Sequence, residues 1–526
     1  MNHTLTIHHA GKVFTLDAQT GDSLYALLAA NGFALDAPCG GKHKCKKCLI
    51  SASGALDAPS AAEKTFLPDT SSRLACFVQI LGDATVRLPE TFAMRISTEG
   101  YAQQPLVAQA DAFGAGALGV AFDIGTTTVA SFLYDLSDGR RLAVKASVNP
   151  QRRFGADVIS RITHCMEQAD GLAQLQDTLA QLLNELIDQL VNDAGVSRQS
   201  VVRVSVAGNT VMGHLLHGLD PKGLAAIPFS AKTLFGSTVP AAVVKLSLCD
   251  SAQVYTLPGI ASYVGGDITA GLLAVQAHQA EKPFLFVDVG TNGEIAFGDK
   301  TQMWCCATAA GPAFEGADIT CGMAGVDGAI CAVRREQNEL VYDTIGSKPA
   351  KGLCGSGLID ALAVCLDIGL VDETGRLLDA DEVDGDIAHL LVETADAQPA
   401  VRIAEDIVLT AGDIRKLQLG KAAIAGGIAT VLAQAEAQME SVSNFFIAGG
   451  FGSFINIDSA CRIGLFPAKL RSVMRVVGNT AAEGAILALV QDEQSAIEAI
   501  RDACLYVELS TSPDFMENYV NNMMFL

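Results

Sequence analysis

The chain has 526 residues, half of them apolar, and its 58 acidic against 36 basic residues give a formal net charge of −22. This length is too great for one hydrophobic core, so we expect about three or four units of 100 to 200 residues. The acidic balance argues against nucleic acid or an anionic membrane as a partner. The longest uninterrupted apolar stretch, residues 422–433, is too short to cross a bilayer, so we expect no membrane helix.

The amino-terminal residues alternate apolar and polar side chains, and residues 5–8 and 13–16 are predicted to form a hairpin. The chain does not begin with a basic stretch followed by an apolar run. We therefore expect mature chain rather than a signal peptide, and a protein that stays in the cytoplasm. Asp22 or Ser23 is expected to cap a helix that ends at Gly32, and residues 85–88 to form a later strand.

A cysteine-rich loop follows at residues 39–48, with the sequence CGGKHKCKKC, and a further cysteine stands after a gap of 27 residues. The four cysteines of this pattern are Cys39, Cys45, Cys48 and Cys76. Their spacing is close to the plant-type [2Fe-2S] pattern, with one extra residue in the first gap. Gly40 and Gly41 allow the backbone to approach a cluster closely. With the flanking strands and helix, the pattern predicts a β-grasp, ferredoxin-like domain over residues 1–89.

Two other uses of these thiols remain open. They could form a zinc site, although zinc ligands usually come as two close pairs, or Cys45 and Cys48 could form a thioredoxin-type redox pair. The remaining scattered cysteines are expected to be core residues. The four lysines of the loop either dock an acidic electron donor, raise the potential of the cluster, or form a solvated surface.

After a predicted linker at residues 90–118, the rest of the chain contains an internal repeat. The segments LGVAFDIGTTTVASFLYD and PFLFVDVGTNGEIAFGD each predict a strand, a tight glycine turn and a second strand. They place Asp123 and Asp288 at equivalent positions, 165 residues apart. Each half continues with a third strand, at residues 142–148 and 301–306. We predict duplicated lobes at 119–281 and 282–526, the second with an insertion, in a chain that is α/β overall.

Such hairpins have a chemical use. Glycine and small hydroxyl residues after a buried strand direct backbone N–H groups at a phosphate, and the aspartate that ends the strand can hold Mg²⁺ through its waters. Two hairpins of this kind, followed by Gly449 and Gly450 at a later strand end, predict a phosphate clamp with a shelf for adenosine. The alternative is that both hairpins are only structural.

At this point the residues resemble the superfamily of acetate kinase, sugar kinases, Hsp70 and actin. More narrowly, they resemble the reductive activators of corrinoid proteins. The narrower resemblance covers most of the chain and rests on long motifs. They are FDIGTTT, NPQRRFGADVISRI, VAGNTVMGHLL, PGIASYVGGD, DVGTNGE, AAGPAFEGADI, GLCGSGLID, IAGGFG and a tail ending in NYVNNMMF.

The resemblance implies an enzyme that uses ATP to return an inactive Co(II) corrinoid protein of a methyltransferase system to Co(I). It implies a low-potential electron donor and a homodimer as well. By motif match, Asp123 and Asp288 organise Mg²⁺, and Asp267 and Glu294 are candidates to position the attacking water. The residues expected to hold phosphates and adenosine are Gly125, Thr126, Thr127, Gly290, Thr291, Asn292, Gly449 and Gly450.

The segment from Cys305 to Gly316 is expected to touch the corrinoid partner, with Thr308 and Glu315 as its candidate contacts. A buried strand end is the alternative for Thr308. Two other functions also remain open. The chain could be an ATP-driven electron donor for a dehydratase, although such activases are expected to hold their cluster between two subunits. It could also be a redox sensor in which nucleotide and cluster only switch a binding surface.

Overall fold

The contacts within the chain divide it into two units. The computed structural model describes residues 2–525, apart from residues 10–11, 32, 34, 36, 38–40, 42, 44–47, 68–71, 89–105, 107–115, 395–396, 451–454 and 492. The first unit holds Met1–Ala93 and Asn149–Leu182, and the second holds Met94–Val148 and Leu183–Leu526. Helix α5, Gly171–Ala194, therefore begins in the first unit and ends in the second.

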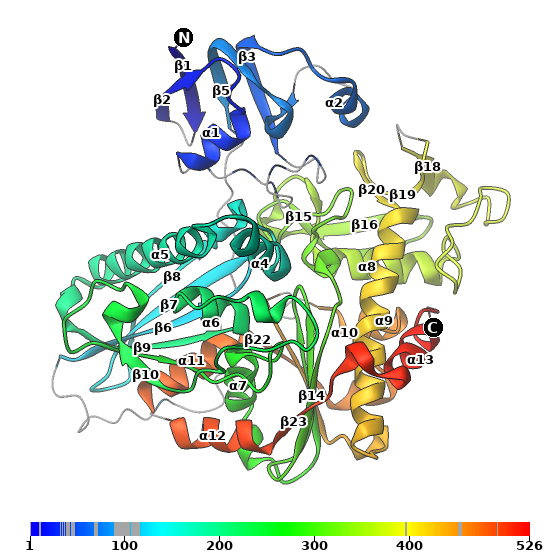
Figure 1. Cartoon of the computed structure of the whole chain (residues 1–526). Helices are drawn as coiled ribbons and strands as arrows, with labels where there is room; N and C mark the ends of the chain where they lie inside the picture. The colour runs from blue at the N-terminus through cyan, green and yellow to red at the C-terminus, as the bar shows by residue number, and fades with distance from the viewer. Residues whose placement is uncertain are drawn as a thin grey trace. The chain divides into compact units, whose positions relative to one another are not determined.

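The first unit is built on a five-stranded sheet of order β2-β1-β5-β3-β4 (Figure 1). Its strands are β1 (Asn2–His9), β2 (Lys12–Gln19), β3 (Leu49–Leu56), β4 (Arg73–Leu74) and β5 (Ile80–Arg87). Strands β1 and β2 pair as an antiparallel hairpin, and β1 pairs with β5 in parallel. Leu5 and Ile7 are fully buried while their neighbours are more exposed, because successive side chains of a strand point to opposite faces.

Polar side chains set the starts of the helices in this unit. Helix α1 (Leu24–Ala30) begins after Ser23, whose hydroxyl accepts the Ala26 N–H, so the structure selects Ser23 over Asp22 as the cap. Helix α2 (Ala61–Phe66) begins after Ser60 in the same way, and α4 (Val158–Glu167) begins with a capping box at Asp157. Leu24 and Leu28 of α1 join the sheet residues in one hydrophobic core.

The second unit contains two six-stranded sheets. The first has the order β10-β11-β9-β6-β7-β8, with strands β10 (Thr238–Pro240), β11 (Gln253–Thr256), β9 (Val201–Gly208), β6 (Leu118–Ile124), β7 (Thr128–Asp135) and β8 (Arg141–Val148). The second has the order β22-β21-β12-β13-β14-β23, with strands β22 (Met474–Gly478), β21 (Asn444–Ala448), β12 (Phe284–Val289), β13 (Gly293–Gly298), β14 (Met303–Thr308) and β23 (Cys504–Tyr506).

The two sheets repeat one pattern. In each, a central strand, β6 or β12, forms a hairpin with the next strand, and a third strand continues the antiparallel side. On its other edge each central strand pairs in parallel with a later one, β9 or β21. The internal repeat of the sequence is therefore also a repeat of the fold, and β8 and β14 are the third strands predicted near residues 142–148 and 301–306.

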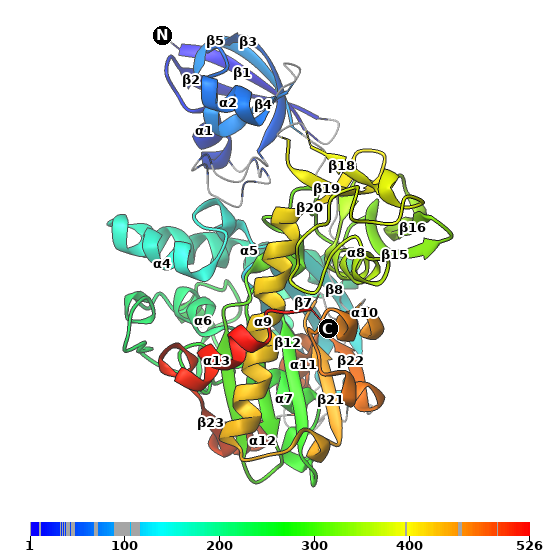
Figure 2. The same ribbon diagram turned by 90° about the vertical axis from the view of Figure 1, so that its right-hand side faces the viewer.

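Helices α7 (Gly266–Ala274) and α11 (Thr480–Val490) pack against each other within a core shared by the two sheets. They approach closely: a Cβ added to Gly484 would lie 2.0 Å from the Ala270 carbonyl oxygen. Helix α9 (Ala411–Gln434) contacts β13 and β14, and α13 (Pro513–Asn521) lies beside it (Figure 2).

The remaining elements of this unit complete the two halves. Between β14 and α9 lie β15 (Ala329–Glu336), β16 (Glu339–Thr344), β17 (Gly352–Leu353), α8 (Gly355–Asp367), β18 (Leu391–Glu393), β19 (Pro399–Ala404) and β20 (Ile407–Thr410). The other helices are α6 (Thr210–Leu216), α10 (Ile457–Arg462) and α12 (Gln494–Ala503). Among the described residues, the helices are too short or too polar to span a bilayer. Most of the predicted linker lies outside the described residues.

Candidate functional site

The two hairpin turns of the second unit have closely related local structures. Each follows the aspartate near the end of a central strand, Asp123 in β6 and Asp288 in β12. In the first turn the Gly125 N–H donates to the Thr128 carbonyl at 2.9 Å, and in the second the Gly290 N–H donates to the Asn292 carbonyl at 2.9 Å. Gly125 must be glycine, because a Cβ there would lie 2.8 Å from the Thr128 carbonyl oxygen.

Buried carboxyl groups gather at these strand ends. Burial, opposed by a hydrogen bond from Asn479, raises the pKa of Asp123 to about 6. Burial and then the charge of Asp123 raise the pKa of Asp267, in the first turn of α7, to about 7. Burial and the charges of Asp267 and Asp123 raise the pKa of Asp288 to about 7. Burial also raises the pKa of Glu294 in β13 well above its usual value. Repulsion among these groups favours a cation beside them.

Two asparagines that were absent from the sequence-based candidates bond to this site, one to a carboxyl group and one to the first hairpin turn. Asn479 caps α11 and donates from Nδ2 to Asp123 Oδ2 at 2.7 Å. Asn209 caps α6 and donates from Nδ2 to Thr126 Oγ1 at 3.1 Å. Both stand in the tripeptide Gly-Asn-Thr directly after a parallel strand. The repetition of this tripeptide is the sequence signal that could have identified them.

Glu315 connects the two hairpins. Thr127 Oγ1, in the first turn, donates to Glu315 Oε2 at 3.4 Å. Thr291 Oγ1, in the second turn, donates to Glu315 Oε1 at 2.9 Å. The sequence placed Glu315 at a partner surface, whereas here its carboxylate accepts hydrogen bonds from both predicted phosphate loops.

Thr308, the other expected partner contact, is 3% exposed. Its hydroxyl donates to the Gly293 carbonyl at 3.1 Å, and a Cβ added to Gly427 of α9 would lie 2.6 Å from its methyl group. Thr308 therefore packs between the second hairpin and α9, in agreement with the buried strand end considered as the alternative. This burial does not support a direct contact between Thr308 and a docked protein.

The Gly449–Gly450 pair follows β21, next to the second hairpin. Gly449 has φ of +100°, and a Cβ there would lie 2.4 Å from the Val289 carbonyl oxygen and 2.8 Å from Asp288 Oδ1. Its N–H donates to the Gly478 carbonyl at 3.1 Å. By contrast, among the described residues other than its chain neighbours, no atom comes within 4 Å of a Cβ built on Gly450. Within that part of the chain, close packing requires a glycine at position 449 and not at position 450.

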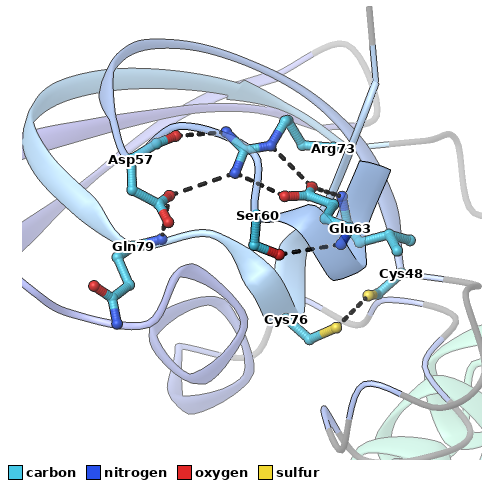
Figure 3. A network of polar contacts seen from close by, with 8 residues as sticks. Cys48, Asp57, Ser60, Glu63, Arg73, Cys76 and Gln79 are labelled. Carbon is cyan, nitrogen blue, oxygen red and sulfur yellow. Dashed lines mark hydrogen bonds and ion pairs between the residues drawn. The ribbon is translucent and has the colours of Figure 1, made fainter. Parts of the chain in front are cut away.

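In the first unit two of the four expected cluster cysteines are described, and their thiols converge. Cys48 precedes β3 and Cys76 lies in the 3₁₀ turn after β4. Their sulfurs are 3.4 Å apart (Figure 3), and the hydrogen bond between the two thiols lowers the pKa of Cys48 to about 7. Cys39 and Cys45 lie outside the described residues.

A buried ion pair holds the segment that carries Cys76. Arg73 donates from Nε to Glu63 Oε1 at 2.9 Å and from Nη2 to Glu63 Oε2 at 3.0 Å (Figure 3). Glu63 Oε1 also accepts the Leu74 N–H at 2.9 Å, and Arg73 Nη1 donates to the Asp57 carbonyl at 2.9 Å. The network fixes β4 against α2 and the end of β3, two residues before Cys76.

The donor sets of the two units differ in their fit to metal. Within the described part of the chain, no three His, Cys, Asp or Glu side chains are placed to bind one ion together. Mg²⁺ usually keeps several waters and is bound by one or two carboxylates and substrate phosphates, which Asp123 and Asp288 can accommodate. The converging thiols of Cys48 and Cys76 fit two ligands of an iron–sulfur cluster, because both must reach a group only a few ångströms across.

Comparison with known proteins gives matches over both units. The family model described as "RACo middle region" matches residues 118–280, and "C-terminal domain of RACo the ASKHA domain" matches residues 282–526. The corrinoid activation enzyme RamQ of Eubacterium limosum is 35% identical over an alignment of 426 residues, and the match covers 77% of this chain and 70% of that protein.

Two further matches extend this result. The [Co(II) methylated amine-specific corrinoid protein] reductase of Methanosarcina barkeri is 23% identical over an alignment of 402 residues, and the match covers 69% of this chain and 68% of that protein. A solved structure, that of a reductive activator for corrinoid, iron–sulfur protein, is 29% identical with a TM-score of 0.72. This match covers 99% of the present chain and 98% of the other.

Proposed function

Because this chain belongs to the RACo family, the reductive activators of corrinoid proteins, we propose that it uses ATP to drive one electron from an iron–sulfur cluster to the Co(II) of a corrinoid protein. The product is the Co(I) form that accepts a methyl group. Two relatives bear names that describe this activity, corrinoid activation enzyme and Co(II) corrinoid protein reductase. The observation that carries the proposal is the pair of like hairpins, one in each sheet, that face shared carboxylates and meet at Glu315.

The first unit supplies the electron. Its central parallel pair, β1 and β5, flanked by antiparallel strands and covered by α1, supports the ferredoxin-like β-grasp that the sequence predicts. Cys48 and Cys76, together with Cys39 and Cys45, are the proposed ligands of a [2Fe-2S] cluster. Such a cluster stores one electron at a time at about −400 mV in plant-type ferredoxins.

The second unit is the proposed ATP site. Asp123 and Asp288 hold Mg²⁺ through its waters, and Mg²⁺ offsets phosphate charge. The two turns, with their backbone N–H groups and the hydroxyls of Thr126, Thr127 and Thr291, bind the phosphates. Asn292 shares this role at the second turn, and Gly449 and Gly450 support the adenosine. Asp267, whose pKa is raised to about 7, and Glu294, whose pKa burial also raises, orient the attacking water, and Asp267 can accept its proton near neutrality.

ATP is needed because the electron moves uphill. For one electron, each 59 mV uphill costs about 1.4 kcal/mol. The reduction potential of a corrinoid Co(II)/Co(I) couple is more negative than that of a plant-type cluster, so the cluster alone does not reduce it. A nucleotide can shift such an equilibrium only by differential affinity for two states. We therefore expect the second unit to bind the corrinoid protein more tightly in one nucleotide state than in the other.

The test is anaerobic reconstitution of the full chain with iron and sulfide, a low-potential reductant and candidate corrinoid proteins. We expect Co(I) absorbance to appear only when ATP and reductant are both present, and to be absent in the Cys76→Ser variant. A dehydratase activase would hydrolyse ATP without reducing cobalt. A redox sensor would bind its partner and leave the cobalt spectrum unchanged. Either result would refute the proposal.

A further inference from the structure

The carboxylate of Glu315 accepts hydrogen bonds from two of the hydroxyls that the proposed ATP site offers to phosphate. Its two oxygens are divided between the hairpins, with Oε2 accepting from Thr127 at 3.4 Å and Oε1 accepting from Thr291 at 2.9 Å. A Cβ built on Gly290 would lie 3.8 Å from Oε1, so the carboxylate also lies over the backbone of the second turn. Phosphates and carboxylates are both anions whose oxygens accept charge-assisted hydrogen bonds from hydroxyl and N–H groups.

The chain around Glu315 places this group on a short turn between two glycines. Pro312–Glu315 forms a 3₁₀ turn, and Gly311 and Gly316 on either side of it have φ of +77° and +74°. Phe314 is fully buried, and its ring lies 3.0 Å from the Cβ position of Gly420 on α9. Phe314 thus anchors the turn in the core, while the next residue bonds to both hairpins.

This arrangement has an electrostatic consequence for nucleotide binding. The charge of Glu315 adds to burial, Asp267 and Asp123 in raising the pKa of Asp288. A fifth negative group therefore stands among carboxyls that already repel one another. A terminal phosphate that needs the Thr127 and Thr291 hydroxyls must take them from Glu315 and cannot share the space with its charge.

We propose that Glu315 is the residue that senses the terminal phosphate of ATP: it occupies the place of that phosphate between the hairpins and is displaced when ATP binds. This inference rests on the proposed ATP site. In the absence of nucleotide, Glu315 is then a positioning residue that keeps the two hairpin turns at the separation a bound phosphate would require. It also makes the nucleotide response specific, because ADP and adenosine leave the position of Glu315 free while ATP does not.

The binding test uses the full chain and compares the non-hydrolysable ATP analogue AMP-PNP with ADP and adenosine, each by calorimetry in the presence of Mg²⁺. Glu315→Gln keeps the shape and removes the charge. Asp318→Asn is the matched control, because Asp318 is an acidic residue of the same loop, three positions further along the chain.

We expect Glu315→Gln to bind AMP-PNP about tenfold more tightly than the wild type. This gain in binding free energy, about 1.4 kcal/mol, is the scale of one hydrogen bond to a charged group. ADP and adenosine should bind to both within about twofold, and Asp318→Asn should match the wild type.

Equal or weaker binding of AMP-PNP by Glu315→Gln would overturn the inference, since it would mean that the Glu315 carboxylate does not compete with the terminal phosphate. Hydrogen exchange on the wild type provides a second test that needs no variant. The amides of residues 313–317 should exchange faster with AMP-PNP than with ADP, and unchanged or slower exchange would also overturn the inference. A wild-type chain that binds none of the three nucleotides would refute the proposed function itself, an outcome distinct from a failure of Glu315 alone.

Discussion

The Arg73–Glu63 pair of the first unit gives a prediction whose magnitude follows from its burial. The side chains of Arg73 and Glu63 are 8% and 2% exposed. Replacing Arg73 with methionine keeps apolar volume but leaves the Glu63 carboxylate buried without its cation, although it still accepts the Leu74 N–H. Loss of one partner of a buried ion pair costs about 3–5 kcal/mol. With a urea dependence of about 2 kcal/mol per molar, the midpoint of unfolding should fall by about 1.5–2.5 M.

Two optical signals separate the units in this experiment. Visible circular dichroism of the reconstituted cluster reports the first unit. Fluorescence of Trp304, the single tryptophan of the chain, reports the second unit and is the internal control. We expect Arg73→Met to shift the cluster transition and to leave the tryptophan transition unchanged.

The double variant Glu63→Gln with Arg73→Met distinguishes charge from packing. The glutamine side chain introduced by Glu63→Gln can still accept the Leu74 N–H, and it carries no charge, so the double variant should recover at least half of the lost stability. The reasoning is wrong if Arg73→Met unfolds within about 0.5 M of the wild type, or if the double variant is as unstable as the single one.

Two further predictions concern the second unit. Gly449→Ala should weaken nucleotide binding at least about tenfold, because its Cβ would meet the Val289 carbonyl oxygen and Asp288 Oδ1; calorimetry checks this, and binding within about twofold of the wild type would contradict the packing argument. The raised pKa of Asp288, about 7, means that this carboxyl destabilises the nucleotide-free fold increasingly as pH rises from about 4 to 7. The stability of Asp288→Asn relative to the wild type should therefore increase by about 2–3 kcal/mol as the pH is raised from 5 to 7. Urea unfolding followed by Trp304 fluorescence measures this difference, and a difference that does not change with pH would count against the raised pKa.

The parts of the site that lie on one strand and its following turn were predictable from the sequence. The alternation of apolar residues and the glycine turn identify β6 and β12 with their hairpins, and the repeat aligns Asp123 with Asp288. Spacing alone also suggested that Cys48 and Cys76 converge, because a loop with several thiols and a distant fourth one is typical of cluster binding. In each case the signal is a sequence pattern that can be recognised without knowing how separate elements pack.

The contacts that join separate elements were not predictable in the same way. Asn479 reaches Asp123 across 356 residues, and Glu315 reaches Thr127 across 188. The repeated Gly-Asn-Thr tripeptide could mark Asn479 as a candidate, but both contacts depend on how α11 and the turn after β14 pack against other elements, which no local pattern encodes. For the same reason Glu315 was expected at a partner surface. The pairing of Arg73 with Glu63 also arises from tertiary packing, since β4 and α2 carry no motif that links them.

The central claim is that the ATP cleft drives the electron of the first unit to cobalt, and a single turnover with pre-reduced protein tests it most directly. Wild-type chain and the Asp288→Asn variant are reduced to the same extent, freed of excess reductant and mixed with a Co(II) corrinoid protein and Mg²⁺-ATP. The account predicts about one Co(I) for each cluster oxidised in the wild type, and a cluster that stays reduced in Asp288→Asn. Co(I) formed at equal yield by the variant, or by the wild type without ATP, would contradict it.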